Sequence, residues 1–426
     1  MQTEVHVTIV TRLTGAMMLS LVLAMPASAE EKAVPTFTKD VAPIFYDNCV
    51  SCHRPGEFAP MALIDYDDAR PWARAIKQRV EAREMPPWDA EAGHQDYAND
   101  ASLSTDEIET ISAWVVGGAP KGDDADLPKA PQFSARWTIG EPDVVVSMLE
   151  PYSVPADGAV PYLYFTVPTN FSEDKWIQAV EIRPGDRRVV HHVIATLQRP
   201  DPDNPPSPEA SLTRRRRRQT GSLGGTVPNK LGVVYPKGVA KKIKAGSEIV
   251  LQMHYTTIGE ATTDKTSVGL IFSDTPPDRT VGSSLLINAR FAIPAGIENH
   301  EVRSERTIKK DTYLTTMTPH MHSRGKAFSY TAVYPNGTEE VLLNVPNYRF
   351  DWQLTYELAE PKLLPAGTKL VGVANFDNSV NNRANPDATV EVRWGDQTWE
   401  EMMIGFFGTL RPADVRNATT DTNGQR

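Results

Sequence analysis

The sequence predicts a multidomain chain in which a small all-α domain precedes two all-β antiparallel sandwich domains. Three observations support this prediction. Beyond residue 140, apolar and polar residues alternate in short runs that turn residues separate, and the whole chain holds 34 Pro and 27 Gly. Residues 30–126 instead show helical spacing. Charge also changes there: residues 30–126 hold 9 Lys and Arg against 20 Asp and Glu, whereas residues 127–426 hold 34 against 33.

The predicted helical domain spans residues 30–126. Its clearest helix begins at Ser104 and Glu107, which match the Ser-x-x-Glu capping box. Gly117 and Gly118 end this helix. The apolar residues that fall on one of its faces are Ile108, Ile111 and Trp114.

The β region is predicted to form one sandwich over residues 140–280 and a second over residues 281–415. A polar linker with Gly and Pro covers residues 127–139, and residues 416–426 are expected to form a disordered tail. The runs with strand-like character are residues 143–146, 162–165, 189–197, 248–255 and 369–374.

The segment from Arg199 to Lys230 contains five prolines, then the run Arg214 to Arg218, then three glycines. Such a basic run can bind an anionic partner, but it more often forms a solvated loop, which is the interpretation we favour.

The first 29 residues resemble a cleaved signal peptide. An apolar run from Leu13 to Met25 precedes Ala27-Ser28-Ala29, a small-x-small cleavage pattern, so cleavage is expected after Ala29. The run is too short to span a bilayer, and the alternative is an uncleaved anchor. The mature protein is therefore expected in the periplasm or outside the cell, without stable membrane insertion. The net charge of −10 argues against nucleic-acid binding.

Both cysteines of the chain lie in the motif Cys49-Val50-Ser51-Cys52-His53. Cys-x-x-Cys-His is the attachment motif of c-type haem, in which both thiols bond to the haem and the histidine binds its iron. The alternative is a redox Cys-x-x-Cys with an incidental histidine. Having only two cysteines excludes a disulfide framework and a zinc site of four thiolates.

The sixth ligand of a haem iron is expected to be Met85, which two prolines follow directly. Met61 and His94 are the rival ligands, and an open site is the remaining alternative. A His53–Met85 pair suits electron transfer, whereas an open site suits oxygen or peroxide chemistry.

Five further histidines lie in strand-like runs, which is unusual, and they are candidate metal ligands. His320 and His322 are two residues apart, so a strand places both on one face. His191 and His192 are neighbours, so binding one ion requires either a twisted backbone or different ring nitrogens. His254 stands alone in its run. A satisfied strand residue is the ordinary interpretation of any one of them.

Met402 and Met403 lie near the end of the chain, after Glu400 and Glu401. A thioether beside imidazoles selects copper over zinc, calcium or magnesium. Core packing is the ordinary interpretation of a methionine.

In this order, His-His, a lone strand His, His-x-His and an acidic-Glu-Met motif resemble the type II copper, ascorbate-dependent monooxygenases. Peptide-amidating hydroxylase and dopamine β-hydroxylase belong to that family. The resemblance covers residues 137–412, about two thirds of the chain. The domain in front resembles a class I cytochrome c, and bacterial proteins with this fusion are similar over nearly the whole mature chain.

The resemblance implies two jelly-roll-like sandwiches that face each other across a solvent-filled cleft, each with one copper. It assigns His191, His192 and His254 to the electron-storing copper. It assigns His320, His322 and Met402 to the copper where O₂ reacts, and these three are the predicted catalytic residues. Met403 is the less favoured alternative to Met402, and it occupies the position of a cysteine in animal members.

By this resemblance the protein is expected to be an oxidoreductase, a copper monooxygenase that hydroxylates a C–H bond of a small organic substrate with O₂. Electrons would come through the fused haem from a periplasmic donor, or from an ascorbate-like reductant. The first alternative is a non-catalytic periplasmic haem and copper protein for electron transfer or copper binding. The second is a cytochrome joined to a binding sandwich whose histidines are structural.

The resemblance also bears on the substrate. Amidating members hold a peptide carboxylate with an Arg and a Tyr, at positions that Thr318 and Phe406 occupy here. Glycine-extended peptides are therefore expected to be poor substrates.

Overall fold

The computed structural model describes residue 1 and residues 33–57, 59–133, 137–202, 205–207, 209, 211, 219–226 and 232–412. The predicted signal peptide, the Arg214–Arg218 run and the predicted tail lie outside the described residues. From Pro35 onward the chain forms one unit, separate from Met1–Val34.

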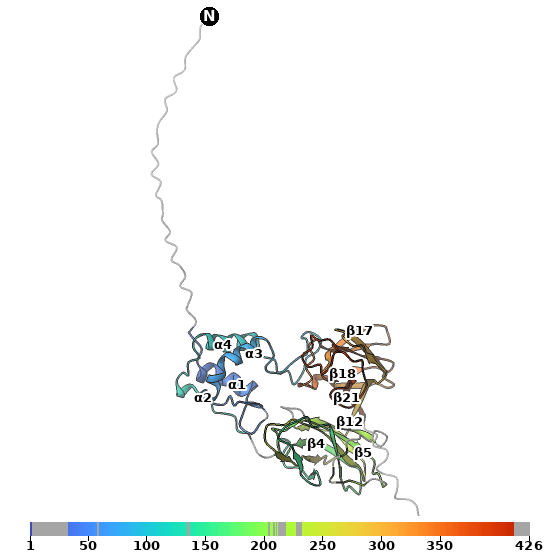
Figure 1. Ribbon diagram of the computed structural model, residues 1–426. Helices are drawn as coiled ribbons and strands as arrows, with labels where there is room; N and C mark the ends of the chain where they lie inside the picture. The colour runs from blue at the N-terminus through green and yellow to red at the C-terminus, as the bar shows by residue number, and fades with distance from the viewer. Residues whose placement is uncertain are drawn as a thin grey trace, which may run out of the picture. The chain divides into compact units, whose positions relative to one another are not determined.

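Strands make up most of the regular secondary structure of the described residues (Figure 1). Up to residue 272 they are β1 (Val144–Ser147), β2 (Tyr152–Val154), β3 (Leu163–Pro168), β4 (Lys175–Arg183), β5 (Val190–Gln198), β6 (Gln219–Thr226), β7 (Gly232–Val234), β8 (Val239–Ile243), β9 (Glu248–Tyr255), β10 (Thr262–Asp264) and β11 (Ser267–Phe272). In the second half they are β12 (Arg279–Asn288), β13 (Ala292–Ile293), β14 (His300–Thr307), β15 (Thr312–His320), β16 (Gly325–Val333), β17 (Glu339–Val345), β18 (Tyr356–Leu364), β19 (Lys369–Phe376), β20 (Val392–Arg393) and β21 (Met403–Pro412).

The first group of strands encloses an apolar core. The four-stranded sheet β3-β9-β5-β6 contributes side chains such as Phe165 and Leu251 to this core. The strands β1-β11-β4-β8 contribute others, such as Ile177 and Leu270. Inward-facing apolar residues alternate along β9 and β5, as expected where one face of a sheet packs on another sheet.

The second group of strands encloses a separate core. The sheet β14-β19-β16-β17 packs Phe328 and Phe376 into it, and β15 and β21 add Met317 and Phe407. These aromatic and branched residues suit a pleated, buried surface.

The two groups of strands share one sheet. Its nine strands run β1-β11-β4-β8-β12-β21-β15-β18, with β7 paired to β4. The connection is the parallel pairing of β8 with β12, where Arg279 faces Val239 and Thr280 faces Ala240. The two sandwiches therefore do not form independent units, because backbone hydrogen bonds continue from one sandwich into the other.

The predicted all-α class I cytochrome c domain is also wrong. The structure is mostly β-sheet, and its helices are short. The α-helices are α1 (Ala42–Asn48), α2 (Tyr66–Ala69), α3 (Ala73–Glu81) and α4 (Thr105–Val116), and the 3-10 and π segments are η1 (Phe37–Val41), η2 (Arg70–Trp72) and η3 (Asp124–Asp126). They cover a small core that includes Phe37, Phe45 and Trp114.

Residues 82–104 explain why a self-contained helical domain does not form. This segment has no regular helix, and Tyr97 forms a bridge with Leu358 of β18. Trp88 and Tyr97 pack against the core of the second sandwich, where the Trp88 ring lies 5.0 Å from that of Tyr356. Pro86 and Pro87 disfavour helix at the start of this segment, so its aromatic residues are buried against the neighbouring sheet.

Several local predictions are confirmed. The capping box at Ser104 and Glu107 is present, and α4 ends before Gly117. All five predicted strand runs overlap strands, and the run 248–255 matches β9 at both ends. Among the described residues, the structure contains no helix with the length and apolar character needed to cross a bilayer.

Replacing Trp88 tests whether residues 82–104 belong to the second sandwich. We expect Trp88→Ala to lower the free energy of unfolding by about 3 kcal/mol, because it removes a large ring packed on Tyr97 and Tyr356. Trp72, which is 44% exposed, provides the control. Trp72→Ala should change the free energy of unfolding by less than about 1 kcal/mol. Equal effects in a denaturant titration would contradict this packing.

Candidate metal centres

The first centre consists of His191, His192 and His254. Strands β5 and β9 pair so that His192 lies opposite His254. The register shifts between Val190 and His192, which makes His191 the extra residue of a β-bulge. A bulge breaks the strict alternation of side chains. His191 and His192 can therefore point toward the same position although they are adjacent in the sequence. The bulge provides the backbone distortion that a shared ion was expected to require.

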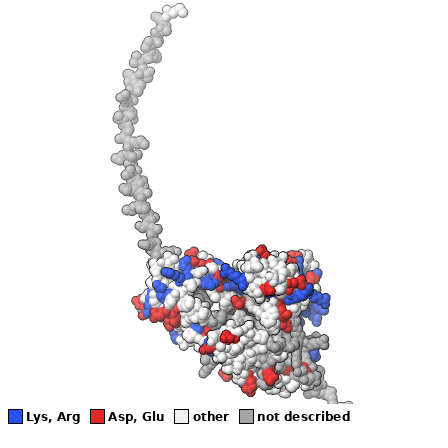
Figure 2. Space-filling model, in the orientation of Figure 1, with Lys and Arg blue, Asp and Glu red and all other residues white. Residues whose placement is uncertain are grey.

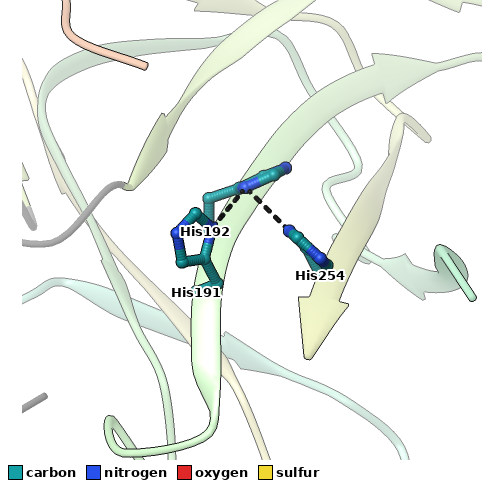
Figure 3. A group of neighbouring side chains, drawn as sticks. All are labelled: His191, His192 and His254. Atoms are coloured by element: carbon teal, nitrogen blue, oxygen red, sulfur yellow. Dashed lines mark hydrogen bonds between the residues drawn. The ribbon is translucent and has the colours of Figure 1, made fainter. Parts of the chain in front are cut away.

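The three imidazoles converge through their Nδ1 atoms (Figure 3). The Nδ1 of His192 lies 3.2 Å from that of His191 and 3.4 Å from that of His254. One ligand atom of each residue lies within 4.8 Å of the others, as a shared ion requires. Three imidazoles form a donor set that suits copper, zinc, iron or nickel.

Burial keeps these imidazoles neutral, which a metal ligand requires. It lowers the pKa of His254 to about 3, with a smaller contribution from His191. It also lowers the pKa of His192 well below the usual value, and that of His191 as well. Each imidazole of this centre therefore has one ring nitrogen with a free lone pair at neutral pH.

The second centre contains His320 and His322. His320 ends β15, and the two rings lie 5.3 Å apart. His320 Nδ1 lies 2.6 Å from Oε1 of Gln353, and the Nδ1 of His322 lies 3.1 Å from the backbone oxygen of Glu400. When each Nδ1 carries the proton, Nε2 is left as the ligand atom. Nε2 of His322 is buried and has no hydrogen-bond partner.

Glu401 holds the backbone around the second centre. Its two carboxyl oxygens accept hydrogen bonds from the backbone N–H of His322, at 2.8 Å, and of Arg324, at 2.6 Å. The side chain is fully buried, and this burial raises its pKa to about 8. The buried guanidinium of Arg324 donates to Asn378 and to the backbone oxygen of Trp399. This network fixes the loop that carries Met402.

The two methionines occupy different environments. Met403 is the first residue of β21 and belongs to the core of the second sandwich. Met402 is 4% exposed and is not part of that core. Alternation along the chain points the two side chains in opposite directions. Met402 is thus the methionine of the pair that does not pack in the core, so its thioether is available as a candidate metal ligand.

Aromatic rings lie between the two centres. The ring of Tyr162 is 4.9 Å from that of His254 and 6.3 Å from that of His322. The ring of Phe350 is 6.2 Å from His254 and 5.9 Å from His322. We call Tyr162 and Phe350 the aromatic wall. The resemblance implied a solvent-filled cleft between the centres, whereas here two side chains touch both.

Cys49, Cys52 and His53 form a turn after α1. The backbone N–H groups of Cys52 and His53 both point at the backbone oxygen of Cys49. The thiols are not paired with each other, and burial raises the pKa of Cys49 to about 12. His53 Nδ1 lies 3.1 Å from the backbone oxygen of Met61, which leaves Nε2 for another partner. Free thiols and this ring orientation both suit haem attachment.

Met85 and the haem-attachment motif do not line the same cavity. Met85 lines a cavity of about 530 Å³ together with residues from Val80 to Ile108, and neither Cys49 nor His53 lines it. The rival ligand His94 forms a hydrogen bond with Glu91, with its Nε2 2.9 Å from a carboxyl oxygen. The backbone oxygen of Met61, the other rival ligand, forms a hydrogen bond with His53 Nδ1.

Sequence reasoning missed several residues around the centres. Four of these residues contact the histidines from loops or strand ends, namely Tyr162, Phe350, Gln353 and Glu401. Glu401 belongs to the acidic-Glu-Met motif, but that motif did not predict its contact with the backbone of His322. Glu401 adjoins Met402 in the sequence, but its role depends on a turn that brings residue 401 under residue 322. No sequence signal marks the other three.

No protein-family model matches the chain, and no curated protein matches it. Some solved structures show distant likeness. The major capsid protein P2 from bacteriophage PM2 is 8% identical with a TM-score of 0.29, over 64% of this chain and 98% of that one. A structure of infectious bursal disease virus Gx strain is 8% identical with a TM-score of 0.20, over 64% and 72%. Allantoicase is 9% identical with a TM-score of 0.16, over 53% and 81%. Scores this low support no conclusion about this chain.

Acid should destabilise the metal-free protein through its buried histidines. The pKa of His254, about 3 when folded, lies below its usual value of 6.5, so its contribution is present above pH 6.5 and is lost as pH falls. Near pH 5, we expect the slope of unfolding free energy against pH to be about 1.4 kcal/mol per unit smaller in His254→Gln than in wild type.

Denaturant titrations between pH 7 and pH 5 measure this slope. His300→Gln is the matched control, because His300 lies on β14 outside both centres. A slope that is identical in wild type and His254→Gln contradicts the burial of a neutral imidazole at the first centre.

Proposed function

We propose that the protein is a copper-dependent monooxygenase that hydroxylates a C–H bond of a small organic substrate. The main support is that the chain brings His191 and His192 together with His254, about sixty residues further along, and places the rings of His320 and His322 5.3 Å apart. Buried polar nitrogens without partners are rare, and Nε2 of His322 is one. Bound copper would supply the redox chemistry that activates O₂.

The residues at each centre have separate tasks in this proposal. His191, His192 and His254 bind the electron-storing metal through Nδ1. His320, His322 and Met402 bind the second metal, where the substrate reacts, because Met402 is free of the core. Gln353 and the backbone oxygen of Glu400 orient the two imidazoles, and such partners commonly change metal affinity 10- to 100-fold.

Covalent haem at Cys49, Cys52 and His53 remains part of the proposal, although the surrounding fold is not that of an all-α cytochrome. The free thiols and the orientation of His53 support attachment there. Met85 is the proposed sixth ligand. Glu57, close behind the motif, pairs with Arg187, which precedes His191 by four residues, so this turn contacts the segment that leads into the first centre.

The natural electron source is proposed to be a periplasmic donor, or an ascorbate-like reductant. The leader predicted in the first 29 residues supports a periplasmic or secreted location. The face drawn in Figure 2 carries acidic and basic side chains together. Two acidic residues of the N-terminal region, Glu57 and Asp89, are held in ion pairs within the chain.

A non-catalytic copper protein is the second candidate, and one observation favours it. His322 is fully buried, and the aromatic wall covers it on the side of the first centre. A metal enclosed in this way suits storage or electron transfer. Oxygen consumption with a reductant separates the two candidates, because only the monooxygenase couples it to a hydroxylated product.

Copper analysis tests the proposed sites. We expect two copper ions per chain in wild type. The single variants His254→Ala and His320→Ala should each bind one copper ion, because each change removes an imidazole from a different centre. Inductively coupled plasma analysis with EPR on purified, copper-loaded protein makes the measurement. His300→Ala is the control and should keep two ions. Wild-type protein that binds no stoichiometric copper contradicts the proposed function.

Glycine-extended peptides should be poor substrates. Thr318 and Phe406 offer no cation or phenol for a peptide carboxylate, and Phe406 instead packs 6.1 Å from the His320 ring. We expect kcat/KM for such a peptide to be at least about 100-fold below that of a true amidating enzyme, as the loss of a charge-assisted contact implies. Product analysis by mass spectrometry decides this, and efficient turnover contradicts it.

A further inference from the structure

One short segment touches both histidine centres. Residues 348–353 lie in the connection between β17 and β18, and we call them the coupling loop. The residues of this loop that contact a centre or its neighbouring chain are Tyr348, Arg349, Phe350, Asp351 and Gln353. None of them belongs to a motif that the sequence singled out.

Three members of the loop hold the second centre. The hydroxyl of Tyr348 donates to the backbone oxygen of Met321 at 2.8 Å, and accepts from its N–H at 3.1 Å. Met321 is the residue between the two histidines, so this contact fixes both. Gln353 accepts from Nδ1 of His320, and Phe350 packs on His322.

Two members of the loop reach the first centre. Phe350 packs on the ring of His254. Asp351 lies close to His191, where burial lowers the pKa of the imidazole and the charge of Asp351, followed by its backbone, partly offsets that fall. Consecutive residues thus contact histidines of both centres, and a rigid displacement of the loop would disturb both.

Arg349 contacts neither centre but instead contacts residues 84–89, the segment that contains Met85. Its guanidinium forms an ion pair with Asp89, with Nη2 to Oδ1 at 2.7 Å and Nε to Oδ1 at 2.9 Å. Its Nη1 donates to the backbone oxygen of Glu84 at 3.1 Å. The Asp89 side chain is 8% exposed, so solvent screens this pair only weakly.

We propose that residues 348–353 couple the occupancy of both histidine centres to the position of the segment Glu84–Asp89, and that Arg349 is the positioning residue of this coupling. The inference rests on the proposed function, because it requires that metal bind at the histidines. When metal fixes His191, His254, His320 and His322, the loop that packs on them loses freedom. Arg349 then passes this restraint to residues 84–89.

Hydrogen exchange measures the coupling directly. We expect copper loading of the wild-type full chain to slow exchange in peptides that cover residues 84–89 by at least about 5-fold, the lower end of ordinary coupling between sites. In Arg349→Met, copper should still protect residues 348–353 but should leave residues 84–89 unchanged. Asp89→Asn removes the other charge of this ion pair, so copper should again protect residues 348–353 and leave residues 84–89 unchanged.

Two further variants distinguish coupling from general loss of structure. The charge swap, Arg349→Asp together with Asp89→Arg, should restore part of the protection at residues 84–89. Arg393→Met removes an exposed ion pair with Glu391 in the same sandwich and should behave as wild type.

The outcomes separate the two proposals. Copper binding with unchanged exchange at residues 84–89 in wild type overturns the coupling and leaves the proposed function intact. Equal protection in wild type and Arg349→Met also overturns it. A wild-type chain that takes up no copper overturns the proposed function and the coupling together.

Discussion

The parallel pairing of β8 with β12 determines how close the two metal centres lie. It continues the sheet of the first sandwich into that of the second, so the two cores cannot separate without breaking backbone hydrogen bonds. The first centre lies on β5 and β9, and the second lies at the ends of β15 and β21. With the sandwiches fixed in this way, Tyr162 and Phe350 can contact histidines of both centres. A hinge between independent sandwiches would not hold such contacts.

Burial of the ligands has a cost that bound metal can offset. Neutral imidazoles in an apolar setting lose hydration, and Nε2 of His322 regains no hydrogen bond. The buried carboxyl of Glu401 has a pKa of about 8, so at neutral pH it is mostly protonated in the fold and ionised in the unfolded chain. Its contribution to stability therefore decreases as pH rises from 4.5 toward 8. Polar groups retained in a core at such a cost are typical of functional sites.

The sequence allowed accurate prediction wherever one local rule decides the structure. Ser104 and Glu107 form the predicted cap, and β9 spans the predicted run, because capping and alternation are properties of short segments. His191, His192 and His254, which the resemblance assigned to one copper, do lie together in the structure. Long-range packing was not predictable. The helical spacing in residues 30–126 gave no sign that Trp88 and Tyr97 would pack on the second sandwich, and that packing is incompatible with an independent all-α domain.

The same limit applies to the site. The candidate ligands were recognised from short sequence motifs, but the bulge at His191 depends on the partner strand, and the coupling loop has no sequence pattern of its own. The central claim is that the two centres lie on either side of one aromatic wall. The dipolar interaction between two Cu(II) ions, measured by EPR on fully loaded wild-type protein, tests it most directly. We predict a spectrum broadened by spin–spin coupling, and loss of this broadening when either centre is emptied. A spectrum equal to the sum of two isolated type II centres would contradict the account.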